Sequence, residues 1–191
     1  MVVFCGSNYG YDEVYAEAAY RTGVVLAEKN IDVIYGGSKL GLMGALAEGV
    51  LQNNGRIIGI IPHFLQTKEI AHDHLSELIL VDTMHERKLK MHEHSNGILA
   101  LPGGWGTMEE LFEMMTWAQL GLHQKPIGIL NVNGFYEPLL VFLNNMVREG
   151  FLKEDFMKMI LVSDDIFELL ENMWHYKPTL EIPKWMSKQK T

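Results

Sequence analysis

Short apolar runs alternate with longer segments of helical periodicity along this chain of 191 residues. The apolar runs predict strands at residues 2–5, 31–35, 56–61, 78–81, 97–101, 126–131 and 159–162. The longer segments predict helices at residues 12–29, 41–53, 84–95, 107–120, 135–149 and 164–173. Several strands are almost continuously apolar, as in Ile57-Ile58-Gly59-Ile60-Ile61, which is typical of a parallel sheet covered on both faces. The alternation therefore predicts an α/β fold: a doubly wound, Rossmann-like, mostly parallel sheet with helices on both faces.

The predicted elements follow one another without a linker, a repeat or a low-complexity segment. We therefore expect one α/β domain over residues 1–191. This length is enough for a substantial core, and a hydrophobic fraction of 48% fits a soluble globular protein. Residues 176–191 contain two prolines and four lysines, and we expect them to form a surface tail.

The charge balance and the single cysteine narrow the class of protein. A formal net charge of −8 argues against binding to nucleic acids. No apolar run reaches the ~18 residues that a membrane span needs. The first predicted strand directly follows Met1, which leaves no room for a signal peptide. Cys5 has no partner for an internal disulfide, so the cytoplasm is the expected location.

Glycines follow three of the predicted strands: Gly6 after the first, Gly36-Gly37 after the second, and Gly103-Gly104 after the fifth. Ligands of doubly wound sheets bind beyond the carboxyl ends of the strands, so we expect these glycines at the ligand edge. Residues 36–41 have the glycine spacing of a P-loop, but Leu42-Met43 stand where Lys and Ser or Thr are needed. No G-x-G-x-x-G segment follows a strand. The sequence therefore does not support ATP hydrolysis or dinucleotide-dependent redox chemistry.

The segment 99–110 carries the strongest chemical signal in the chain. It consists of the end of an apolar strand, a glycine turn, and the start of a helix that bears carboxylates. Three glycines, Gly103, Gly104 and Gly106, allow the backbone to approach a ligand closely. Thr107 is placed to cap the helix that follows. Free N–H groups at such a helix start, with the helix dipole behind them, predict a phosphate site.

Two helix starts share the pattern Thr-x-x-Glu of a capping box, at residues 83–86 and 107–110. Arg87 lies one position past the first box, and Glu110 ends the second. If the preceding strands are neighbours, the two side chains face one crevice. The alternative is that Glu110 is only a capping residue and Arg87 only a surface charge. Cations are disfavoured near a helix N-terminus, so Arg87 and Lys88 there indicate an anionic partner.

The histidines do not form a metal motif. On a helix, His92 and His94 lie roughly 200° apart around the axis, and His85 and His92 lie roughly 10 Å apart along it. His72 and His74 form a lone H-x-H in a polar segment, a pattern that is usually solvated. We expect no metal site.

Residues 102–110, Pro-Gly-Gly-Trp-Gly-Thr-Met-Glu-Glu, match the P-G-G-x-G-T-x-x-E signature of the LOG family, the cytokinin riboside 5′-monophosphate phosphoribohydrolases. Residues 84–88 match its M-H-x-R-K element, and the chain resembles this family from the first strand to about Phe151. The resemblance implies a homodimer without a cofactor that splits a nucleoside 5′-monophosphate into free base and ribose 5-phosphate. Many members carry the older label "lysine decarboxylase", but this chain shows no convincing lysine site for pyridoxal phosphate.

The resemblance also assigns site residues. Arg87 and Glu110 match the catalytic pair. The implied substrate-binding residues are Glu69, Met84, Lys88, Gly103, Gly104, Trp105, Gly106, Thr107, Met108, Glu109 and Thr116. Two departures bear on the choice of base and substrate: Ser38 stands where a third glycine is common, and Trp105 replaces a frequent tyrosine.

The residues suit this chemistry. Glycosidic cleavage passes through an oxocarbenium-like state that a carboxylate can stabilise, and a carboxylate can also orient water. The alternative is a nucleotide-binding or carrier protein of the same fold without turnover. The two differ in whether AMP is consumed or only bound.

Overall fold

The computed structural model describes residues 1–66 and 72–178, and seven of the segments in these ranges are strands of one sheet. The strands are β1 (Val2–Phe4), β2 (Val33–Tyr35), β3 (Ile57–Pro62), β4 (Glu77–Val81), β5 (Ile98–Ala100), β6 (Ile127–Leu130) and β7 (Ile160–Ser163). Each coincides with a predicted strand. Their order is β4-β3-β2-β1-β5-β6-β7, and every neighbouring pair is parallel, so the predicted doubly wound sheet is confirmed.

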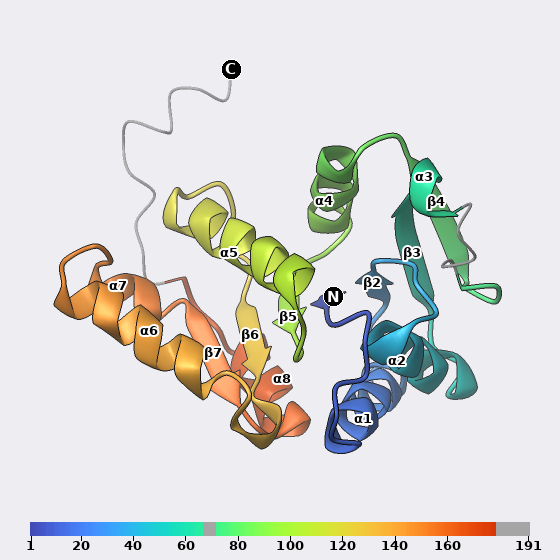
Figure 1. Ribbon diagram of the computed structural model, residues 1–191, viewed down its shortest axis with the longest axis horizontal. Helices are drawn as coiled ribbons and strands as arrows, with labels where there is room; N and C mark the ends of the chain where they lie inside the picture. Colours follow the sequence, from blue (N-terminus) through green and yellow to red (C-terminus); the bar gives the residue numbers. More distant parts are fainter. Residues whose placement is uncertain (67–71, 179–191) are drawn as a thin grey trace.

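The helices cover both faces of the sheet (Figure 1). They are α1 (Val14–Glu28), α2 (Gly41–Gln52), α3 (His63–Gln66), α4 (Met84–Glu93), α5 (Trp105–Gln119), α6 (Glu137–Arg148), α7 (Glu154–Met157) and α8 (Ile166–Trp174), with a 3-10 turn, η1 (Val132–Gly134). Six of the helices were predicted. The two that the sequence missed, α3 and α7, have four residues each, which is too short to show a helical period.

Alternate side chains of each strand pack into two hydrophobic cores, one on each face of the sheet. Val3 and Cys5 pack with α1, α2 and α8 on one face, whereas Val2 and Phe4 pack with α4 and α5 on the other. Because both faces are buried, nearly every strand position is apolar, and this is what made the strands readable from the sequence.

The direction in which successive strands are added to the sheet reverses between β1 and β5. From β1 it builds outward through β2 and β3 to β4 at one edge, and α4 then returns it to β5, beside β1. Val2 pairs with Ile98 at this boundary. Loops that leave the carboxyl ends of two such strands turn to opposite faces and open a crevice between them.

Two expectations lie partly or wholly outside the described residues: the substrate contact Glu69, and residues 179–191 of the predicted surface tail. Within the described ranges, no helix is long and apolar enough to cross a membrane. The same part of the chain holds no group of three or more His, Cys, Asp or Glu side chains that could bind a metal ion.

Candidate active site

A cavity of about 600 Å³ opens where β1 and β5 end. The two strands stay joined past their last residues, because Gly6 N donates a hydrogen bond of 3.0 Å to the carbonyl of Pro102. The walls come from the loop after β1, the start of α2 and the start of α5. Side chains from more distant segments complete it, among them Arg87 of α4 and Phe135 after η1. The glycines after β1, β2 and β5 therefore meet at one cavity, as the sequence predicted.

Helix α5 begins at Trp105, two residues earlier than predicted, with Gly104 as its N-cap. No side chain from residues 1–66 or 72–178 caps this end, and its first turn carries no acidic residue. The capping box predicted for residues 107–110 is therefore wrong. Thr107 is buried inside the helix, and its hydroxyl lies against Gly103, where an added Cβ would be 2.1 Å from Oγ1. The uncapped N–H groups at the start of α5 remain available to an anion.

The three glycines of this turn differ in whether their surroundings require glycine. Gly103 is fixed by the protein itself, because a Cβ there would also lie 2.9 Å from Gly6 N. At Gly104 and Gly106 a Cβ would meet no atom of the described residues within 4 Å, and neither glycine has a positive φ. The part of the chain that the structure describes therefore does not demand glycine at these two positions. A ligand that approaches the backbone closely would demand it.

Glu110 is buried in the second turn of α5 and lines the cavity. Among the described residues its carboxylate has neither a hydrogen bond nor an ion pair, so it is not a capping residue. Burial raises the pKa of this carboxyl to about 7, and the nearby Arg87 only partly offsets the effect. A buried carboxylate without a partner is costly, and such groups concentrate at functional sites.

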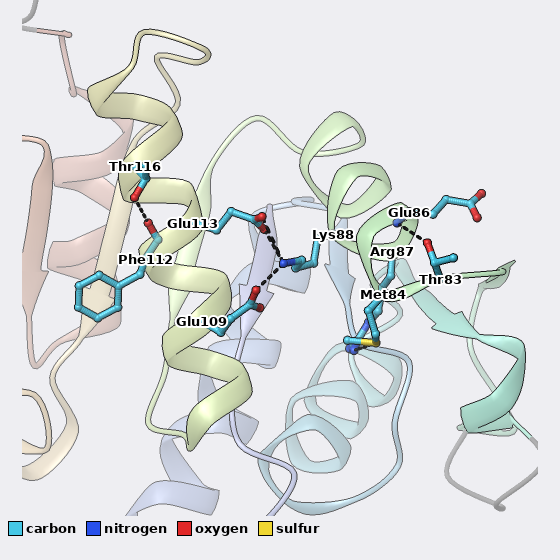
Figure 2. Close-up of polar contacts among 9 residues, drawn as sticks. All are labelled: Thr83, Met84, Glu86, Arg87, Lys88, Glu109, Phe112, Glu113 and Thr116. Carbon is cyan, nitrogen blue, oxygen red and sulfur yellow. Dashed lines mark hydrogen bonds and ion pairs between the residues drawn. The ribbon is translucent and has the colours of Figure 1, made fainter.

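The other predicted capping box, at the start of α4, forms as a hydrogen-bonded turn. Thr83 Oγ1 accepts a hydrogen bond of 3.1 Å from Glu86 N, which confirms Thr83 as the cap. The Glu86 carboxylate accepts from Asp82 N at 3.0 Å rather than from the cap residue's own N–H. This start of α4 sets the direction in which Arg87 leaves the helix (Figure 2).

Arg87 extends from α4 into the cavity. Its Nε donates a hydrogen bond of 3.1 Å to the carbonyl of Ile60 near the end of β3, and its Nη1 lies 3.8 Å from Met84 Sδ. No carboxylate within the described ranges forms an ion pair with it. The strands before α4 and α5 are not neighbours, since β3, β2 and β1 lie between β4 and β5. Arg87 and Glu110 nevertheless line one cavity, because α4 crosses the sheet to reach β5.

Lys88 and Glu109 bind each other instead of lining the cavity. The Lys88 side chain is 8% exposed, and its ammonium donates hydrogen bonds to Glu109 and, at 3.2 Å, to Glu113 (Figure 2). Both carboxylates belong to α5, so this ion pair joins α4 to α5. In the free protein its role is to fix the distance between the two helices that carry Arg87 and Glu110.

The other predicted contacts take several positions. Trp105 is 93% exposed on the cavity wall, and half-buried Met108 packs against the core beneath α5. Thr116 lies away from the cavity, and its hydroxyl donates to the Phe112 carbonyl at 2.8 Å (Figure 2). Met84 lies beside the guanidinium of Arg87.

Sequence reasoning missed several residues that line the cavity: Ser7, Asn8, Tyr9, Gly10, Tyr15, Met43 and Phe135. Most come from the loops after β1 and β6, and their position beyond strand ends was the available signal. Cys5 also lines the cavity, but burial raises the pKa of its thiol, so it stays protonated and is not a nucleophile.

A family model and individual relatives both place this chain in one protein family. The family model described as "Possible lysine decarboxylase" matches residues 43–173. The chain is 43% identical over 188 residues to the probable cytokinin riboside 5′-monophosphate phosphoribohydrolase LOGL2 of Oryza sativa subsp. japonica, covering 98% of this chain and 76% of that protein. It is also 43% identical to the cytokinin riboside 5′-monophosphate phosphoribohydrolase LOG1 of Arabidopsis thaliana over 179 residues, 94% of this chain and 84% of that protein.

Solved structures of similar fold include two proteins associated with the molybdenum cofactor. The molybdenum cofactor binding protein of Rippkaea orientalis superimposes with a TM-score of 0.67 at 19% identity, covering 91% of this chain and 96% of that one. The Moco carrier protein of Chlamydomonas reinhardtii gives the same TM-score and identity, covering 91% and 95%. At this level of identity the likeness shows the fold alone.

Proposed function

Because this chain belongs to the LOG family of cytokinin riboside 5′-monophosphate phosphoribohydrolases, we propose that it hydrolyses the N-glycosidic bond of a nucleoside 5′-monophosphate. The substrate is a cytokinin riboside 5′-monophosphate or AMP, and the products are the free base and ribose 5-phosphate. The observation that carries the proposal is Glu110: a buried carboxylate that makes no hydrogen bond or ion pair with residues 1–66 and 72–178, in a cavity that also contains Arg87 and the start of α5.

The start of α5 suits the 5′-phosphate of the substrate. Its free N–H groups and the positive end of its dipole favour a phosphate, and the open space above Gly104 and Gly106 allows close approach. Thr107 is buried against Gly103 and supports this turn from behind. Binding of the phosphate holds the ribose beside the second turn of the same helix, where Glu110 lies. Remote binding energy is thereby used to orient the reacting bond.

Glu110 then acts on the sugar. As the bond between C1′ and the base breaks, positive charge develops on the ribose ring, and a carboxylate in a cavity of low dielectric stabilises that charge. Water adds to C1′, and the base leaves with a proton. Arg87, whose Nη groups have no carboxylate partner in the described residues, holds the nucleotide or assists the leaving base.

The proposal predicts release of free base from nucleoside monophosphates. Incubation with a panel of AMP, N6-prenylated AMP, GMP, CMP and UMP, followed by chromatographic detection of the base, is expected to show turnover of the adenine nucleotides. Appearance of ribose 5-phosphate in equal amount checks the reaction type. If calorimetry detects AMP binding but no free base appears from any nucleotide, the protein is a carrier and the proposal is wrong.

We also propose that the protein is a homodimer. The support is the LOG family resemblance, together with exposed apolar side chains on and after the two site helices: Leu89, Leu120 and Leu122 are 46%, 38% and 49% exposed. Multi-angle light scattering at micromolar concentration is expected to give twice the monomer mass of 21.8 kDa. A single species at 21.8 kDa would contradict the dimer. A cytoplasmic location stays a prediction from the sequence.

A further inference from the structure

Gly36, the first residue after β2, lies directly beside the guanidinium of Arg87. A Cβ built on Gly36 would lie 2.1 Å from Arg87 Nη2 and 3.3 Å from its Cζ. The third close atom is Met43 Sδ, at 3.0 Å. The space that a side chain at position 36 would take is therefore already occupied by the arginine, which comes from a helix 51 positions further along the chain.

The protein holds this guanidinium by few other contacts. Nε has its hydrogen bond to the Ile60 carbonyl, and Nη1 lies near the weak acceptor Met84 Sδ. Buried or half-buried arginines are usually fixed by a bidentate carboxylate. Arg87 has none among the described residues, so its orientation depends on one backbone acceptor and on the shape of the space around it.

The backbone at Gly36 does not itself require glycine. Its neighbour Gly37 has a φ of +75°, a conformation in which other residues are strained, but Gly36 is not among the residues with positive φ. The obstacles to a methyl group at position 36 are the far end of Arg87 and the sulfur of Met43, both of which can move without disturbing the sheet. A side chain there would therefore displace the guanidinium and leave the fold intact.

We propose that Gly36 is a positioning residue. The absence of a side chain at position 36 leaves a space, the arginine seat, and the Arg87 guanidinium that fills this seat points into the cavity. This inference deepens the proposed function and rests on it for its catalytic consequence, since Arg87 is assigned to the substrate. The seat itself is a property of the free protein and can be tested without turnover.

Gly36→Ala is expected to fold normally and to lower kcat/KM for the best nucleotide by about 10- to 100-fold, as expected for a misplaced catalytic group. Gly128→Ala in β6 is the matched control, because a Cβ there would lie 2.5 Å from Met173 Sδ, a similarly flexible atom on the other face of the sheet. The control is expected to keep kcat/KM within about twofold. Equal losses of activity in the two variants, in proportion to their loss of stability, would overturn the proposal.

A double-mutant cycle tests whether Gly36→Ala lowers activity through Arg87. In an Arg87→Ala background, Gly36→Ala is expected to change the residual activity by less than about twofold, because the group it displaces is gone. The same 10- to 100-fold loss in both backgrounds would show that Gly36 acts independently of Arg87, contrary to the proposal.

A readout on the ligand-free protein separates this inference from the proposed function. In nitrogen-15 NMR spectra, the Nε–H resonance of Arg87, which donates to the Ile60 carbonyl, is expected to be protected from exchange with water in the wild type and in Gly128→Ala. In Gly36→Ala it is expected to lose this protection. An unchanged Nε–H resonance in Gly36→Ala would refute the seat, whereas failure of the wild type to release any base would refute only the proposed function.

Discussion

Replacing Glu110 by Gln is expected to leave the fold intact and to lower kcat by about three orders of magnitude. The amide has nearly the same shape but cannot carry the negative charge that the oxocarbenium-like state needs. The carboxylate makes no hydrogen bond within the described residues, so the substitution breaks no contact of the free protein. Single-turnover kinetics with AMP and a thermal melt of both proteins measure the two effects.

The stability of this variant should move in the opposite direction from its activity. Burial raises the pKa of Glu110 from 4.5 to about 7. Relative to the unfolded chain, the wild type therefore loses stability as the pH rises from 4.5 through 7, where the buried group must ionise. Gln removes this cost, so Glu110→Gln is expected to melt at or above the wild-type temperature at pH 8.

Glu113→Gln, one turn further along α5, is the matched control. Glu113 pairs with Lys88 outside the cavity, so its replacement weakens the contact between α4 and α5. Because Glu109 still pairs with Lys88 and joins the two helices, this variant is expected to melt at a lower temperature and to keep its activity within a few fold. A Glu110→Gln protein that retains near wild-type turnover would remove Glu110 from the mechanism.

The pH profile is a second check on Glu110. If the carboxylate form is active, kcat of the wild type rises with pH and levels off above pH 7, the pKa set by burial of this side chain. The residual activity of Glu110→Gln should lack this step. A wild-type kcat that falls as the pH rises through 7 would show instead that the protonated acid is the active form.

Removal of the 5′-phosphate from the substrate is expected to lower kcat/KM by about 10²- to 10⁴-fold, so adenosine should be a far poorer substrate than AMP. Two charge-assisted hydrogen bonds from the start of α5, at about 1.5–3 kcal/mol each, account for a loss of this size. Competitive inhibition of AMP cleavage by inorganic phosphate or ribose 5-phosphate, but not by ribose, would agree with it. Equal rates for adenosine and AMP would contradict the assignment of this helix start.

Gly104→Ala tests the same phosphate site by a change in the protein instead of in the substrate. Because a Cβ there meets open space in the free protein, the variant is expected to melt like the wild type. It should lose at least about tenfold in kcat/KM for AMP, since the methyl group occupies the space of the phosphate, and show no comparable loss for adenosine. A variant that uses AMP as well as the wild type would move the phosphate elsewhere.

The fold could be predicted closely because the five inner strands, β1, β2, β3, β5 and β6, are buried on both faces. A run such as that of β3, Ile57–Pro62, has no polar position that would make it ambiguous, and its boundaries match the predicted 56–61 within one residue. The short helices α3 and α7 were missed because four residues span only about one turn.

The site could be predicted only where local sequence decides it. The cap at Thr83 forms as predicted, because the partner of its hydroxyl is the backbone N–H of Glu86, only three positions later. The same pattern failed at Thr107, because Gly103 leaves room for the threonine to fold inward and the helix starts earlier. The pairing of Lys88 with two carboxylates of α5, and the contact between Arg87 and Gly36, depend on how distant elements pack. No spacing along the chain reveals such contacts.

The pairing of β1 with β5 also governs the order in which the molecule can be assembled. During synthesis β1 is made first, yet its partner on one side, Ile98 opposite Val2, follows 96 residues later. Until then the growing chain presents an open, apolar strand edge, the kind of surface that promotes aggregation. The cavity that Gly6 and Pro102 help to line forms only when both strands are in place, so it is completed late in folding. A nascent chain that ends before β5 is therefore expected to lack the cavity and to expose an aggregation-prone strand edge.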